Sequence, residues 1–186
     1  MRDEATTEPD QRNLRSARLG YRPITATDAG RVAVLAGEWD IARMTSRIPH
    51  PYSLVDADLW IASIGQDEFV RGVEFDGKLI GAVGYIEGAE RQAEIGYWIG
   101  KPYWGRGFAT EAARALVAYC FGPVGFLRLT CGHFIDNPAS ARVIAKLGFR
   151  HVGNGRQWCE ARKSEVETVR FVRKRPLLAA WRSGMR

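Results

Sequence analysis

The chain has 186 residues, of which 46% are hydrophobic and 26% are charged, and its formal net charge is +6. These values exclude a disordered chain and a fibrous repeat, and the length is that of one globular domain. No apolar run approaches the roughly 20 residues that span a bilayer, so we expect no membrane partner.

The net positive charge lies at the C-terminal end of the chain. From Arg170 onward there are six basic residues and no acidic residue, so the residues before Arg170 sum to zero. A single basic segment without a helix-turn-helix, RNP or zinc motif is not the pattern of a nucleic-acid-binding protein. We expect no nucleic-acid partner, and a module that binds nucleic acid through this basic end is the alternative.

The cysteines indicate neither disulfides nor a metal site. Cys120, Cys131 and Cys159 are odd in number and far apart, and they form no CxxC pair or zinc-type spacing. We expect all three to be packing residues in a reducing cytoplasm. Residues 1–16 are polar and of mixed charge, without the apolar segment of a secretory signal, so we predict a flexible leader there.

Hydrophobic periodicity and turn residues predict alternating strands and helices along the rest of the chain. We predict a strand at 17–25, helices at 27–37 and 53–64, strands at 68–75, 78–86 and 91–100, a helix at 107–121, a strand at 127–134, a helix at 138–147, and strands at 151–156 and 166–174.

The two N-terminal helices have candidate caps. Thr27 or Asp28 precedes the first helix, and Ser53 precedes the second. The second helix has its apolar residues at helical spacing on one face, namely Leu54, Ala57, Trp60, Ile61 and Ile64.

Short motifs predict the local geometry further along the chain. Asp76 and Gly77 between two alternating segments indicate a tight β-hairpin. Asn137 followed by Pro138 is typical of a helix start, and Gly148 is typical of the residue after a helix end.

The order of elements contains no internal repeat and no linker long enough to separate two domains. It predicts one mixed α/β domain over residues 17–176, followed by a basic tail at 177–186.

The most informative stretch is IGYWIGKPYWGRGFATEAARAL at 95–116, where a strand leads through two glycines into a helix. Gly105 and Gly107 allow a tight turn, and a helix start offers N–H groups and partial positive charge to an anion. Arg106 and Lys101 would add charge. The stretch fits neither a dinucleotide-binding fingerprint, whose third glycine is missing, nor a Walker loop. Taken alone, it is either a phosphate cradle or a turn whose glycines serve geometry only.

Two further segments decide between these alternatives. FIDNPASARVIAKLGFRHVG at 134–153 and HPYSLVDADLWI at 50–61 accompany the glycine loop. Together the three segments resemble the GNAT acetyltransferases, in particular the branch similar to ribosomal-protein N-acetyltransferases. The resemblance covers residues 17–175.

The loop motif carries most of this resemblance. The family pattern is R/Q-x-x-G-x-G/A, and Gly107 and Ala109 are its small residues here. Trp104 occupies the first position instead of Arg or Gln, which departs from the family pattern. The branch commonly has W-G-x-G-Y/F-A-T-E-A, which this chain matches at 104–112 almost letter for letter.

The resemblance implies a mixed, mostly antiparallel sheet of six to seven strands with helices on both faces, and acetyl-CoA as co-substrate without a metal. Backbone amides of the loop would hold the pyrophosphate, and a splayed strand would offer unpaired backbone groups to the pantetheine amides. Side chains of the later helix would meet the pantetheine arm and the 3′-phosphate. The implied cofactor-binding residues are Tyr97, Trp98, Ile99, Trp104, Gly105, Arg106, Gly107, Phe108, Ala109, Thr110, Asn137, Ser140, Arg142 and Lys146.

Acetyl transfer to an amine needs a group that removes the amine proton and benefits from a proton donor for the thiolate. Glu94, in the strand before the loop, is our candidate for the first role; alternatively it faces outward or pairs with an arginine. The resemblance implies Ser140 for the second role, although a serine in a first helical turn can also satisfy backbone groups.

The acceptor side is less determined. The resemblance places Trp39, His50 and Tyr52 near the amine acceptor, and His133 lies at a strand end beside the candidate site. The acceptor is either a protein N-terminus, which needs an open groove, or a small amine, which needs a closed acidic pocket. A CoA-binding sensor without catalysis is the alternative function. We expect a monomer or a weak homodimer.

Overall fold

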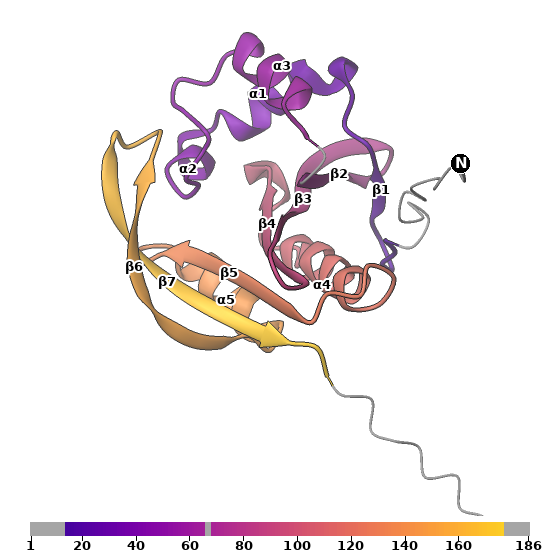
Figure 1. Ribbon diagram of the computed structural model, residues 1–186. Helices are drawn as coiled ribbons and strands as arrows, with labels where there is room; N and C mark the ends of the chain where they lie inside the picture. Colours follow the sequence, from indigo (N-terminus) through magenta and orange to yellow (C-terminus); the bar gives the residue numbers. More distant parts are fainter. Residues whose placement is uncertain (1–13, 66–67, 177–186) are drawn as a thin grey trace, which may run out of the picture.

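A computed structural model describes residues 14–65 and 68–176, which form a seven-stranded sheet with helices on both faces (Figure 1). The strands lie in the order β1-β2-β3-β4-β5-β7-β6, and only β4 and β5 pair in parallel. The predicted mixed, mostly antiparallel sheet is confirmed. The strands are β1 (Gly20–Arg22), β2 (Glu68–Phe75), β3 (Lys78–Gly88), β4 (Gln92–Ile99), β5 (Arg128–Phe134), β6 (Arg150–Cys159) and β7 (Ser164–Lys174).

Helices occupy the connections between the strands. The long helix α4 follows β4 and starts at the predicted glycine loop, and α5 starts at the predicted Asn137 and Pro138. The helices are η2 (Ala26–Asp28), α1 (Ala29–Ala36), α2 (Trp39–Ala42), α3 (Leu54–Ala62), η3 (Lys101–Tyr103), α4 (Phe108–Phe121) and α5 (Pro138–Lys146).

The two faces of the sheet are covered by different helices (Figure 1). On one face α4 and α5 pack over buried strand residues such as Ile95 and Leu129. On the other face α1 and α3 pack over Val70 and Ala82. Because the side chains of a strand alternate between the two faces of the sheet, β4, the strand that leads to the glycine loop, has side chains in both layers.

The β2–β3 hairpin has the predicted turn. Asp76 and Gly77 have φ values of 49° and 70°, and positive φ at both central residues is what a type I′ turn requires. Gly148 follows α5 with φ 74°, as a glycine that ends a helix does.

The N-terminal region differs from the prediction in several places. Leu14, which we expected in the flexible leader, is buried in the core, and the Ser16 hydroxyl accepts a hydrogen bond from the Tyr21 hydroxyl at 3.0 Å. The packed chain therefore includes residues 14–16, while residues 1–13 of the expected leader lie outside the described residues. The expected tail at 177–186 also lies outside them.

The first helical segment differs from the prediction in part. Thr25 caps the short η2 turn, and its amide donates to the Asp28 carboxylate at 2.9 Å. Asp28, one of the two predicted caps, is the N-cap residue of α1, whereas Thr27 is not. Ser53 caps α3 as predicted, because its hydroxyl accepts from the Asp56 amide at 3.2 Å. Leu54 is 54% exposed, so it does not belong to the buried face of α3 as predicted. It is the first residue of the helix and does not pack on the sheet.

None of the helices within 14–65 and 68–176 combines the length and the apolar composition that a membrane-spanning helix needs.

Candidate active site

A cleft opens where β4 and β5 separate. The two strands pair in parallel only between residues 92–94 and 128–130, and β4 then continues beside β3 as far as Ile99. Beyond the paired segment, the β5-facing backbone groups of β4 have no strand partner among the described residues. The cleft has a volume of about 1170 Å³ and reaches from the start of α4 to the loop after α2. This is the splayed strand that the sequence prediction required.

The start of α4 has the local backbone geometry that the predicted anion cradle needs. Gly105 and Gly107 have φ values of 76° and 78°, in the left-handed region that favours glycine. The first helical bond of α4 is donated by the Glu111 amide to the Gly107 carbonyl at 3.0 Å. The amides of residues 108–110 therefore have no acceptor inside the helix, and N–H groups in this position are suited to bind an anion. A Cβ added at Gly105 would meet no atom within 4 Å, so the cradle is open.

Several contacts hold this loop in place. Arg18 forms an ion pair with Glu111 at 2.7 Å and donates to the Arg106 carbonyl at 3.1 Å. The Trp104 indole N–H donates to the Ile99 carbonyl, which ties the loop to the end of β4. The indole thus makes a contact of its own at the position where the family motif has Arg or Gln.

The expected basic side chains of the loop lie elsewhere. The Arg106 guanidinium stacks over the rings of Phe75 and Phe108 at 4.6 and 4.7 Å and does not line the cleft. The Lys101 ammonium pairs with Asp40 at 2.7 Å. Any anion at this loop would be held by backbone N–H groups and not by these two side chains.

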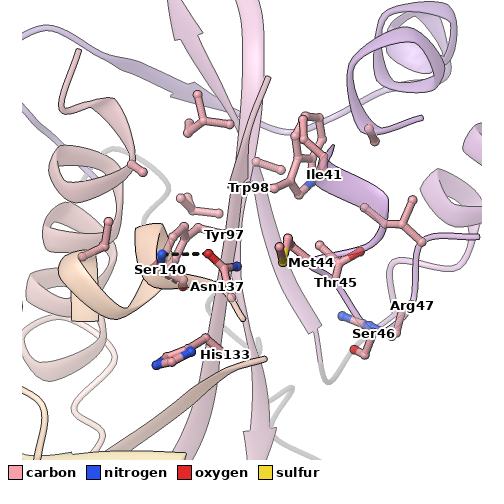
Figure 2. A pocket seen from close by; sticks show the side chains of 18 of the residues that line it. Ile41, Met44, Thr45, Ser46, Arg47, Tyr97, Trp98, His133, Asn137 and Ser140 are labelled. Atoms are coloured by element: carbon pink, nitrogen blue, oxygen red, sulfur yellow. Dashed lines mark hydrogen bonds between the residues drawn. The ribbon is translucent and has the colours of Figure 1, made fainter. Parts of the chain in front are cut away.

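Polar side chains of α5 face β4 across the cleft. Asn137 caps α5, and its side-chain oxygen accepts from the Ser140 amide at 3.0 Å. The Ser140 hydroxyl lies 2.9 Å from the Tyr97 hydroxyl (Figure 2). Burial raises the pKa of Tyr97 to about 12. The sequence therefore placed Asn137 and Ser140 correctly in one cluster, and the structure adds the Tyr97 hydroxyl to it.

Of the two residues expected to bind the 3′-phosphate, one lines the cleft and the other does not. Arg142 lines the cleft, whereas Lys146, one turn further along α5, is exposed and lies outside the lining.

Glu94 lies on the opposite face of β4 from Tyr97. Odd-numbered residues of β4, such as Ile95 and Tyr97, pack toward α4 and α5, and Trp98 packs with α1 and α3. Glu94 shares the face of Trp98, is exposed and lines the cleft. Its carboxylate has no hydrogen-bond or ion-pair partner among the described residues. Between Glu94 and Trp98, a Cβ added at Gly96 would meet no atom within 4 Å, so the floor of the cleft is open there.

The loop after α2 and the β6–β7 turn meet at this end of the cleft. The Cys159 thiol donates to the Thr45 carbonyl at 3.3 Å, the Glu160 amide to the Ser46 carbonyl at 3.0 Å, and the Arg162 Nε to the Arg43 carbonyl at 2.7 Å. We call this set of contacts the clasp. The clasp joins the loop after α2 to the β6–β7 turn, and residues of the α2 loop, β4, β5 and β7 all line the cleft.

The predicted acceptor residues are placed unequally. Tyr52 lines the cleft. Trp39 and His50 pack against each other edge to face at 5.1 Å and lie outside the lining. His133 lines the cleft from the side of α5: its ring stacks on Phe171, and its Nδ1 lies 2.8 Å from the Phe134 carbonyl oxygen.

Sequence reasoning missed most of the acceptor-side wall. Ile41, Met44, Thr45 and Ser46 face Asn137 and Ser140 from across the cleft in Figure 2, yet they belong to no motif. Thr168 of β7 also lines the cleft; it is 5% exposed, and its hydroxyl has no partner among the described residues. A threonine in an alternating strand gives no signal of such a position.

Within residues 14–65 and 68–176, no group of three or more His, Cys, Asp or Glu side chains is arranged to hold a metal ion.

Comparison with known proteins gives one family. A family model described as "Acetyltransferase (GNAT) domain" matches residues 18–150. The chain is 41% identical over 158 residues to the uncharacterized N-acetyltransferase YoaA of Bacillus subtilis, covering 78% of this chain and 86% of that protein. It is 32% identical over 74 residues to the ribosomal-protein-serine acetyltransferase of Escherichia coli, covering 39% and 41%.

Solved structures share the fold. Mycobacterium smegmatis RimJ in complex with CoA-disulfide superposes with a TM-score of 0.75 at 21% identity, covering 84% of this chain and 81% of that one. The microcin C7 self-immunity acetyltransferase MccE, in complex with acetyl-CoA and AMP, has a TM-score of 0.74 at 17% identity, covering 87% and 94%.

Proposed function

The chain belongs to the GNAT family of acetyltransferases, which are acetyl-CoA-dependent acyltransferases, and from this premise we propose that it acetylates a terminal primary amine by direct transfer in a ternary complex. The observation that carries this proposal is the division of roles between the two faces of β4. The hydroxyl pair of Tyr97 and Ser140 lies on the face of α5, and the unpartnered Glu94 carboxylate lies on the other face.

The residues of the cleft fit acetyl-CoA, which supplies an activated thioester when bound. The amides of residues 108–110 and the open cradle at Gly105 suit a pyrophosphate. The free backbone edge of β4 at Tyr97 and Trp98 suits the pantetheine amides, whereas the Ile99 carbonyl already accepts from Trp104. Asn137 and Arg142 line the same cleft; Asn137 suits a contact with the pantetheine arm, and Arg142 suits a contact with the 3′-phosphate.

Proton transfer is divided between the same two faces. Glu94 accepts the proton that the attacking amine loses, directly or through a water. The Tyr97 and Ser140 hydroxyls donate a proton to the departing sulfur. Burial raises the pKa of Tyr97 to about 12, so its hydroxyl keeps its proton at neutral pH and can act as the donor.

The shape of the acceptor side supports one kind of amine. Because the clasp joins the loop after α2 to the β6–β7 turn, this side of the cleft is bounded, and an acceptor enters end-on instead of lying along an open groove. Glu68 and Glu94 stand opposite the same residue of β3, Ile86, but Glu68 pairs with Arg47 at 2.8 Å. The unpartnered Glu94 carboxylate is therefore the group on this face that attracts the protonated form of an amine. We therefore propose a primary amine at the end of a slender group, such as a small amine or a short peptide N-terminus.

The test is an acceptor panel with free-thiol release as the readout. It includes small primary amines, short peptides with free N-termini, and N-terminally blocked peptides with one internal lysine flanked by bulky residues. We expect thiol release with members of the first two groups and none with the third. The proposal is wrong if the purified protein is neither bound nor thermally stabilised by CoA at millimolar concentration, or if no primary amine supports thiol release.

A further inference from the structure

Arg162, in the turn between β6 and β7, contacts both sides of the cleft. Its Nε donates to the Arg43 carbonyl at 2.7 Å, and its terminal nitrogens form an ion pair with Asp136 at 2.9 Å. The guanidinium also lies over the Phe134 ring, 5.3 Å from the centroid. The side chain is 19% exposed, so it is held among these partners and not in solvent.

Each partner leads to a different half of the site. Asp136 directly precedes Asn137, which caps α5 and holds the amide of Ser140. Arg43 begins the loop whose following residues line the acceptor side. The Arg162 guanidinium holds the pKa of Asp136 below its usual range, so the pair stays charged at neutral pH.

We propose that Arg162 is a positioning residue that keeps the acceptor-side loop and the start of α5 at a fixed separation. The bound amine then meets the thioester beside the hydroxyls of Ser140 and Tyr97. The catalytic part of this statement rests on the proposed function, whereas the structural part does not. An arginine suits the task because its planar fork is rigid and presents N–H donors to two acceptors in fixed directions, whereas the donors of an ammonium group rotate freely.

The structural part is tested by hydrogen–deuterium exchange on the full chain. In Arg162→Ala we expect faster exchange in residues 43–48 and 136–140 together. The matched control is Arg156→Ala, which removes an exposed ion pair with Glu165 on the same hairpin and should leave both segments unchanged. Faster exchange in only one of the two segments, or an equal change in the control, would overturn the proposal. This readout needs no acceptor, so it stands even if the acceptor panel finds none.

The catalytic part is tested by steady-state kinetics with an amine from the panel. In Arg162→Ala we expect the KM for the amine to rise about tenfold, with the affinity for CoA changed by less than about twofold. Arg162→Lys should recover part of this loss. Destabilisation alone would lower kcat without raising KM, so an unchanged KM for the amine overturns the proposal. If Arg162→Ala does not fold, Arg162→Lys and Asp136→Asn carry the same test, each expected to raise KM.

Discussion

Gly107 allows the anion cradle to be tested separately from the stability of the fold. The residue has φ 78° and ψ 4° at the start of α4, and a Cβ added there would meet only the Arg18 Nη2, at 3.7 Å. Gly107→Ala thus introduces no clash. An L residue in this conformation costs about 1–2 kcal/mol, and the smaller entropy of the unfolded chain returns about 0.4–1 kcal/mol. We expect a net loss of about 1 kcal/mol, or a Tm lower by roughly 2–4 °C.

The expected loss of CoA binding is much larger. The added methyl group of Gly107→Ala stands where a pyrophosphate approaches the amides of residues 108–110. Hydrogen bonds to a charged group contribute about 1.5–3 kcal/mol each. Losing two such hydrogen bonds at the lower end of this range reduces the free energy of CoA binding by about 3 kcal/mol, which corresponds to roughly 100-fold weaker binding. Gly107→Glu also brings a negative charge beside the phosphates, so we expect no measurable binding.

Gly77→Ala is the matched control. Gly77 has φ 70° in the β2–β3 turn, and a Cβ there would meet no atom within 4 Å, but the residue lies outside the cleft. It should lose as much stability as Gly107→Ala and keep the CoA affinity of the parent protein. Thermal melts and calorimetric titration with CoA give the two quantities. If Gly107→Ala binds CoA within about threefold of Gly77→Ala, the cradle does not hold the pyrophosphate.

Further predictions concern proton transfer and the N-terminal ion pair. Because burial raises the pKa of Tyr97 to about 12, loss of the Tyr97 proton should not decrease kcat at any pH lower than about 10. Tyr97→Phe should lower kcat at least about tenfold. A kcat of the parent protein that already decreases near pH 9 would contradict this role. Glu94→Gln should lower kcat/KM for the amine about 100-fold, while calorimetry shows unchanged CoA affinity; unchanged kcat/KM would exclude Glu94 as the base. Asp28 accepts from Arg22 at 2.7 and 2.8 Å, and this contact holds the pKa of Asp28 below its usual range. The stabilisation is therefore present above about pH 4 and is lost as pH falls through the lowered pKa, so Asp28→Asn should cost about 2 kcal/mol at pH 7 and less at acidic pH in urea titrations. An equal cost at both pH values would refute the assigned charge pair.

Local signals predicted the backbone geometry of the glycine loop and of the start of α5. The glycines of the loop, the cap at Asn137 and the placement of Ser140 depend on backbone conformation within a few residues, which residue type largely determines. The four-residue helix α2 was missed because it is too short to show periodicity. Arg106 and Lys101 were expected to add positive charge at the loop because they lie near it in sequence. In the fold, Arg106 instead stacks on the Phe75 ring and Lys101 pairs with the Asp40 carboxylate.

The acceptor half could not be predicted for a different reason. The clasp joins residues that are more than 110 positions apart, such as Cys159 and Thr45, and its acceptors are backbone carbonyls that every residue type carries. Nothing in the residue pattern of either segment specifies the other. Trp39 and His50 attracted attention as aromatic and titratable side chains, yet they contact each other outside the cleft.

The distribution of charge in the cleft follows from the ion pairs that line it, and it bears on how the two proposed substrates are separated. On the acceptor side, the arginines all have carboxylate partners: Arg43 with Asp40, Arg47 with Glu68, and Arg162 with Asp136. Each of these arginines thus lies beside a carboxylate, although Asp40 also pairs with Lys101, and Glu94 is left without a cationic partner among the described residues. On the cofactor side, the cradle offers N–H groups of a helix start, whose partial positive charge suits an anion. The two sides of β4 therefore differ in polarity in the way that the proposed reaction of a polyanionic cofactor with a cationic amine needs, although the net charge of +6 indicates neither substrate.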